Sequence, residues 1–316
     1  MLKRCRDIDR EAASSAVGSG RDRLADAVFA TVAYREIFDY PLRRDEIKRY
    51  LIATDSDGAA VDAAIDRLLG TALGESGGLV MLAGREDTAK VRRRRERRAA
   101  PMWRQARRYA AVLASLPFVR MVAVTGSLAA NNPSGKPDID FMIVTRAGCL
   151  WRVRTLCTLM RLCDKRFGKA LLCPNYFVSE KALTLRDRRL YVAQELAQMV
   201  PLFGPDVYRK LRRANRWADE YLPNAVGPPC PVDAVAIRWP RLRKGVERVF
   251  DTAPGRWFEA WEARRKIMRY RNRRNDPARW SPFRREATGH QRQMGDRIEK
   301  ALAARLAEFG IRFDVS

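Results

Sequence analysis

Two apolar segments enclose a short polar loop between residues 122 and 144, and this arrangement constrains the fold more than any other feature. The first segment ends in Gly126-Ser127, and the second opens with Asp138-Ile-Asp140. Apolar runs of this length, bounded by glycine and polar residues, are typical of buried strands. The sequence therefore predicts two core strands with a glycine turn and paired carboxylates at their adjoining ends.

Successive side chains of a strand point to opposite faces, so Asp138 and Asp140 are expected on one face, with Ile139 and Phe141 in the core behind them. Two neighbouring carboxylates repel each other unless a positive charge lies between them. Hard cations such as Mg²⁺ commonly take one or two carboxylates together with substrate phosphates. The pair therefore predicts a metal site for Mg²⁺ or Mn²⁺.

The glycine turn is suited to phosphate. Gly126 removes a side chain where the backbone has to approach a ligand closely, and the Ser127 hydroxyl and nearby amides are then able to donate to phosphate oxygens. The alternatives are a solvated strand edge for the two aspartates and an ordinary Gly-Ser turn. The complete arrangement, with an apolar strand on each side, favours the site.

These residues resemble the nucleotidyltransferase superfamily that includes DNA polymerase beta, whose pattern is an apolar strand, Gly-Gly or Gly-Ser, about ten residues, and Asp-x-Asp or Asp-x-Glu. Here ten residues separate Ser127 from Asp138. The resemblance covers about residues 118–180 and implies an α/β (α+β) fold, a small mixed sheet packed on helices. It also implies an NTP substrate and the transfer of a nucleoside monophosphate to a hydroxyl, with Gly126 and Ser127 at the phosphates and Asp138 and Asp140 at the metal.

Family members carry a third carboxylate on a later strand, and this chain departs from that pattern. The next strand is expected at residues 171–178, after a helix from about 150 to 167, and places Asn175 where the acid would stand. An amide is neutral and a poor base. Either another acid, Glu180 first and Asp164 second, completes the site, or the protein binds nucleotide and metal while catalysing slowly as a nucleotide-sensing or nucleic-acid-binding regulator.

The composition predicts a globular cytoplasmic protein. The chain has 316 residues, of which 47% are hydrophobic, and no apolar run is long enough for a transmembrane helix. Residues 1–23 lack the apolar core of a secretory signal and are expected to form a disordered leader. The cysteines show no Cys-x-x-Cys spacing and are interpreted as reduced thiols, at positions 5, 149, 157, 163, 173 and 230.

Basic residues are concentrated in two segments. Residues 90–108 carry nine and residues 238–316 carry eleven of the 25 net positive charges. Such a surplus indicates a polyanionic partner, nucleic acid first and an anionic membrane surface second, although a GC-rich genome would also raise the arginine content. Residues 90–108 are equally consistent with the solvated face of a connecting helix.

The first part of the chain resembles a winged-helix module. Helices are expected at residues 24–40, after Pro41 and at 57–70, followed by a hairpin that ends at Leu82. The third helix would be the one to enter DNA. It carries Asp62 and Asp66 with only Arg67, which favours a docking or regulatory role over phosphate contact.

The remaining chain is expected to be helical. Amphipathic helices are predicted at residues 190–203 and 208–221 and from about 291 to 309. Trp257 and Trp261 fall at helical spacing and are expected in a core, with base stacking as the alternative. His290 is expected to be structural, not catalytic. The complete division is a leader (1–23), a winged-helix-like module (24–85), a basic connecting helix (86–117), a nucleotidyltransferase domain (118–222), a proline-rich linker (223–236) and a basic helical region (237–316).

Overall fold

The computed structural model describes residues 23–135, 138–166, 171–231, 233–272, 287–288 and 292–309. The chain divides into two compact units, one comprising Met1–Arg92, Asp219–Val226 and Ile298–Ser316, the other Arg93–Ala218 and Gly227–Arg297. The expected leader, up to residue 22, and His290 lie outside the described residues. Mixed helices and small sheets confirm the α+β class.

The first unit contains the helices and hairpin expected of its sequence. A helix at residues 23–36 precedes α2 (Arg44–Arg49) and α3 (Gly58–Leu68), and β1 (Leu73–Ser76) pairs antiparallel with β2 (Leu79–Leu82). Asp57 caps α3 by accepting a hydrogen bond from Ala60 N at 2.8 Å. The acidic residues of α3 pair with Arg44 of α2, which lies 2.8 Å from Asp66 and 3.5 Å from Asp62.

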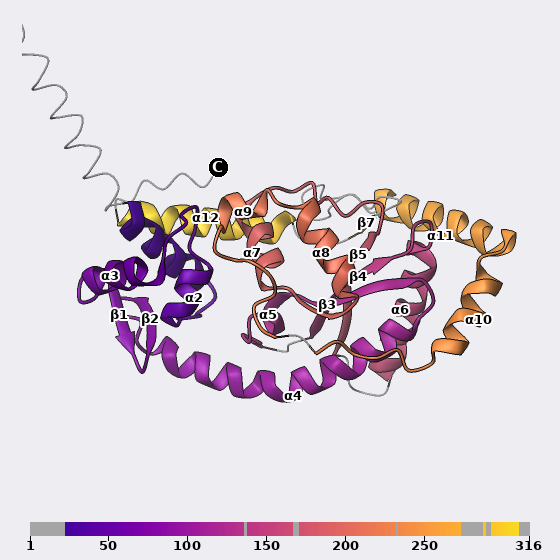
Figure 1. Ribbon diagram of the computed structural model, residues 1–316, viewed down its shortest axis with the longest axis horizontal. Coiled ribbons are helices and arrows are strands. Elements are labelled where there is room, and N and C mark those ends of the chain that lie inside the picture. The colour runs from indigo at the N-terminus through magenta and orange to yellow at the C-terminus, as the bar shows by residue number, and fades with distance from the viewer. Residues whose placement is uncertain are drawn as a thin grey trace, which may run out of the picture. The chain divides into compact units, whose positions relative to one another are not determined.

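A five-stranded sheet forms the centre of the second unit, in the order β6-β3-β4-β5-β7 (Figure 1). Strand β4 runs antiparallel to β3 and parallel to β5, and helix α6 connects β4 to β5. The strands are β3 (Val119–Val124), β4 (Ile139–Thr145), β5 (Leu172–Ser179), β6 (Val200–Phe203) and β7 (Ala287–Thr288).

Helices cover both faces of this sheet (Figure 1). The hydrophobic core lies on one face, where α4 and α6 pack against β3 and β4 through residues such as Leu113, Trp151, Val122 and Phe141. The other face is covered by α7 and α8. The helices that follow the β1–β2 hairpin in the chain, in either unit, are α4 (Thr88–Ser115), α5 (Gly126–Ala129), α6 (Leu150–Arg166), α7 (Leu190–Gln198), α8 (Pro205–Ala214), α9 (Ala218–Tyr221), α10 (Pro240–Phe250), α11 (Ala253–Asn272) and α12 (Arg292–Glu308).

The helix predicted over residues 190–203 is shorter than expected, so the prediction is wrong for its last residues. Helix α7 ends at Gln198, and residues 200–203 form the edge strand β6, which pairs with β3. Pro201 is the physical reason, because it disfavours helical geometry at Val200 and has no N–H to donate within a helix. The helix predicted over 208–221 is likewise interrupted, between α8 and α9.

The prediction that Trp257 and Trp261 pack in a core is also wrong. Their exposed fractions are 66% and 44% on α11. The buried side of that helix is formed by Glu259, Glu262 and Ala263 instead. Among the described residues, no helix has the length and apolar composition required to cross a membrane.

Glu36 is a buried carboxyl of the first unit and makes its stability depend on pH. Its side chain is 1% exposed, with Arg85 Nη2 3.1 Å from Oε1. Burial outweighs the attraction of Arg85 and raises the pKa of Glu36 from 4.5 to about 7. The folded state therefore holds a proton that the unfolded state releases, so this carboxyl lowers stability progressively as the pH rises from about 4.5 to 7.

We expect Glu36→Gln to raise the free energy of unfolding of this unit by up to about 3 kcal/mol at pH 8 and to change it little at pH 4.5. Hydrogen exchange of the amides in the 23–36 helix measures this difference. Glu220→Gln, at an exposed carboxyl of the same unit, is the matched control. Parallel pH profiles for the wild type and Glu36→Gln would contradict the assignment.

Candidate active site

Strand β3 leads directly into the glycine turn. Thr125 N donates to Asp140 O at 3.0 Å, and α5 then begins at Gly126, whose φ is +65°. A Cβ at position 126 would lie 2.7 Å from Asp140 Oδ2, closer than real Cβ contacts allow. Glycine is therefore needed here for two reasons, the left-handed backbone and the approach of the Asp140 carboxylate.

Asp138, directly before β4, and Asp140, within it, bring their carboxylates together as the alternation of a strand predicts. Ile139 and Phe141 are fully buried in the core on the opposite face. The ligand atoms of Asp138, Asp140 and Cys173 all lie within 4.8 Å of one another, so the three side chains form a group able to hold a metal ion. Cys173 is brought there by the parallel register of β4 and β5, in which it stands opposite Asp140.

Asn175 reaches the same carboxylate through an irregularity in β5. Phe141 pairs with Pro174 and Met142 with Tyr176, so Asn175 is the extra residue of a bulge. Both Asn175 and Cys173 donate side-chain hydrogen bonds to Asp140. Cys173 also hydrogen-bonds Asp138, so it bridges the two acids.

The electrostatics of this group favour a cation. Burial, followed by the charge of Asp138, raises the pKa of Asp140 to about 6 against the hydrogen bonds from Cys173 and Asn175. Burial and the two aspartates also raise the pKa of the Cys173 thiol. Asp140 and Cys173 are thus harder to ionise, and a bound cation would relieve the repulsion between the negative charges.

A pocket of about 80 Å³ opens beside this group. Its lining includes Gly126, Asp140 and Asn175 from the strand ends and Glu195 from α7. Its remaining walls are mostly apolar and aromatic side chains of α7, of the sheet and of the loops beside them. Ser127 follows on α5, half buried, and is not among the described residues that line the pocket.

Glu195 is a site residue that the sequence argument missed. Its Oε2 accepts a hydrogen bond from Gly126 N at 3.3 Å, and its Oε1 accepts one from Gln198 Nε2 at 2.6 Å. The available signal was an acid within the buried side of α7, between Val192 and Leu196. A carboxyl in an otherwise apolar stripe requires a polar partner, and here the partner includes the glycine turn.

The two acids proposed as substitutes for Asn175 lie elsewhere. Asp164 accepts hydrogen bonds from the Tyr109 hydroxyl and from Leu171 N and Leu172 N, the latter two at 2.9 and 3.0 Å, so it holds the start of β5. Glu180 accepts from Ala147 N at 3.1 Å, beyond the other end of β5. Neither lines the pocket as the described residues define it.

Helix α4 holds the loop that follows the glycine turn. Arg95 Nη1 donates to Asn132 Oδ1 at 2.9 Å, and Trp103 Nε1 donates to Asn131 Oδ1 at 2.6 Å. Asn131 has a φ of +53°, which asparagine tolerates better than most residues. Part of the 90–108 segment therefore supports the loop between β3 and β4 structurally.

No family model matches this chain, and no curated protein or solved structure matches it either. The residues around Asp138 and Asp140 are therefore the basis on which a function is inferred.

Proposed function

We propose that this protein is a metal-dependent nucleotidyltransferase, which transfers a nucleoside monophosphate from an NTP to a hydroxyl and releases pyrophosphate. The observation that carries the proposal is the Asp138, Asp140 and Cys173 group beside the Gly126 turn, on adjoining strands of one sheet. Asp138 and Asp140 would hold Mg²⁺ or Mn²⁺ against the triphosphate, and Gly126 and Ser127 would lie at the phosphates.

The pocket restricts how a nucleotide is held. Sites that enclose a small molecule typically measure about 300–1,000 Å³, and this pocket measures about 80 Å³. It has room for an ion with its water molecules or for a phosphate group. The proposed nucleotide would therefore place its phosphates at the pocket and its nucleoside outside.

The donor set fits a divalent cation but departs from a pure magnesium site. Two carboxylates are ligands that Mg²⁺ and Mn²⁺ accept, and the cation supplies charge neutralisation at the phosphates. The third group, Cys173, offers sulfur, which hard cations disfavour. Glu195, which lines the pocket beside the Gly126 turn, is the acid we assign to accept the proton of the attacking hydroxyl.

A catalytically weak nucleotide-sensing or nucleic-acid-binding protein is the second candidate. Cys173 and Asn175 favour it, because β5 places a thiol and an amide where a third carboxylate would serve an active transferase. Such a protein would bind NTP and metal without appreciable turnover. The exposed arginines of α4, at positions 93, 94, 97 and 98, would then offer contacts for a nucleic acid.

The test is release of pyrophosphate from a mixture of labelled NTPs with Mg²⁺ or Mn²⁺, with and without cell extract as a source of acceptor. We expect release from the wild type and none from Asp138→Asn/Asp140→Asn, while equilibrium dialysis shows that the double variant no longer binds Mn²⁺. Equal release from both proteins would overturn the proposal. NTP and Mn²⁺ binding without release would select the second candidate.

A further inference from the structure

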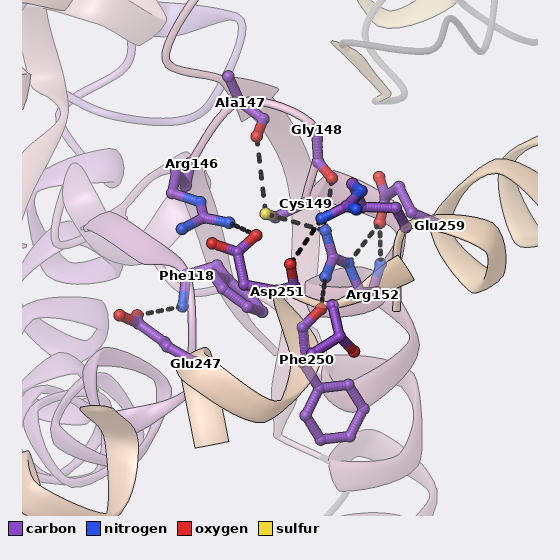
Figure 2. Close-up of polar contacts among 12 residues, drawn as sticks. Phe118, Arg146, Ala147, Gly148, Cys149, Arg152, Glu247, Phe250, Asp251 and Glu259 are labelled. Atoms are coloured by element: carbon purple, nitrogen blue, oxygen red, sulfur yellow. Dashed lines mark hydrogen bonds and ion pairs between the residues drawn. The ribbon is translucent and has the colours of Figure 1, made fainter. Parts of the chain in front are cut away.

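Helices α10 and α11 follow each other in the chain, and polar groups attach both of them to the rest of the unit (Figure 2). On α10, Arg243 donates to the carbonyl oxygens of Ala114 and Val119 at 2.8 and 2.5 Å, and Glu247 accepts from Phe118 N at 2.6 Å. These bonds join α10 to the start of β3 and the end of α4. Helix α10 is therefore attached through hydrogen bonds. An amphipathic surface helix normally packs its apolar side against the core instead.

The turn and α11 are attached in the same way (Figure 2). Asp251 pairs with Arg146, and Phe250 O accepts a hydrogen bond from Arg152. On α11, Glu259 accepts from Trp151 N and Arg152 N at 2.9 and 2.8 Å, so this buried carboxylate caps the first turn of α6.

Several large apolar side chains of both helices are exposed to solvent, although Ala263 and Ile267 of α11 pack against the core. Trp257, Trp261 and Met268 of α11 are 66%, 44% and 57% exposed, and Leu242 and Val249 of α10 are 63% and 68% exposed. At 3.6 residues per turn, the three α11 side chains fall within about 40° of one another. They lie opposite the buried Glu259 and Glu262 and form an exposed apolar stripe, beside which Arg264 also falls.

The charges around this apolar stripe are positive. Residues 238–272 contain four acids, and each is already engaged with a basic or main-chain group of the same unit, namely Glu247, Asp251, Glu259 and Glu262. Arg264, Arg265 and Arg269 are exposed along α11, and Arg265 lies over the Trp261 ring at 5.2 Å. A partner for this side of α11 must be both apolar and anionic.

We propose that the exposed apolar side chains of α10 and α11, with the arginines beside them, bind an anionic lipid surface. Tryptophan is suited to the boundary between headgroups and acyl chains, and arginine holds its charge at the headgroups while its stem covers apolar surface. A single-stranded nucleic acid would stack on the parallel Trp257 and Trp261 rings, which are 6.2 Å apart. A nucleic acid would leave the exposed aliphatic side chains of Leu242 and Val249 without an apolar partner. The acyl chains of a lipid surface would provide one.

The test uses the full chain and sedimentation with two kinds of vesicle, phosphatidylcholine alone and phosphatidylcholine with 30 mol% phosphatidylglycerol, at low and high salt. We expect binding to the anionic vesicles, weakened by salt, with a blue shift of tryptophan emission. Trp257→Ala/Trp261→Ala should weaken binding at least about tenfold, because two large aromatic side chains leave the interface. Arg264→Gln/Arg269→Gln should weaken binding to the anionic vesicles selectively.

Leu159→Ala/Leu162→Ala is the matched control, since these α6 residues are 54% and 58% exposed on the same unit. It should bind vesicles as the wild type does, and thermal unfolding should show that every variant is folded. Failure to bind anionic vesicles, or equal binding by the tryptophan and leucine variants, would overturn the proposal. So would tryptophan-dependent binding of a single-stranded oligonucleotide in place of vesicles. The proposal is independent of the site at Asp138 and Asp140.

Discussion

Gly126→Ala is expected to lower the proposed transfer activity at least about 100-fold and to weaken Mn²⁺ binding, while the chain stays folded. The added Cβ would stand 2.7 Å from Asp140 Oδ2, so either the carboxylate or the turn has to move. A displacement of about 1 Å at a reacting centre commonly lowers the rate by two orders of magnitude. Steady-state kinetics and equilibrium dialysis with Mn²⁺ measure the two effects.

The control separates this contact from backbone strain. Gly148 has a φ of +68°, close to that of Gly126, but a Cβ there would meet nothing within 4 Å. Gly148→Ala therefore carries the same left-handed penalty of about 1–2 kcal/mol without touching the carboxylates. Equal losses in both variants would mean that strain alone explains the effect, and unchanged Mn²⁺ binding in Gly126→Ala would remove the contact from the site.

The elements that position the site could be predicted because their signals are local. The alternation in Asp138-Ile-Asp-Phe places the carboxylates and the core residues on opposite faces, whatever position the strand has in the sheet. The α6 helix and the β5 strand follow from apolar periodicity in the same way. The first unit's hairpin was likewise marked by glycines between two apolar runs. These predictions agree with the observed elements to within a few residues.

The residues that complete the site could not all be predicted. Their positions depend on the strand register and on packing between segments that are distant in sequence. Cys173 faces Asp140 through the β4–β5 register, and the bulge at Asn175 determines which later residues reach the carboxylate. Glu195 joins the pocket from a helix that starts about 50 residues beyond the second aspartate. Similarly, Trp257 and Trp261 point outward because Glu259 and Glu262 have long-range partners that local periodicity does not reveal.

Cys173→Asp is expected to tighten Mg²⁺ binding at least about tenfold and to raise the proposed Mg²⁺-supported transfer by one to two orders of magnitude. The change replaces a sulfur that hard cations disfavour with a carboxylate within reach of Asp138 and Asp140. A third acid would also accept a proton far better than a neutral thiol or the Asn175 amide. Calorimetric titration with Mg²⁺ and steady-state kinetics check the two expectations.

The same substitution should lower stability when no cation is present. A third carboxylate adds to a group in which burial and Asp138 already raise the pKa of Asp140 to about 6. We therefore expect a lower melting temperature for Cys173→Asp in chelator, and recovery as Mg²⁺ is added, because an ion that binds only the folded state stabilises it. Cys173→Ser is the matched control, since it removes the sulfur without adding charge and should show neither effect. Identical Mg²⁺ affinities for the serine and aspartate variants would show that position 173 does not face the metal.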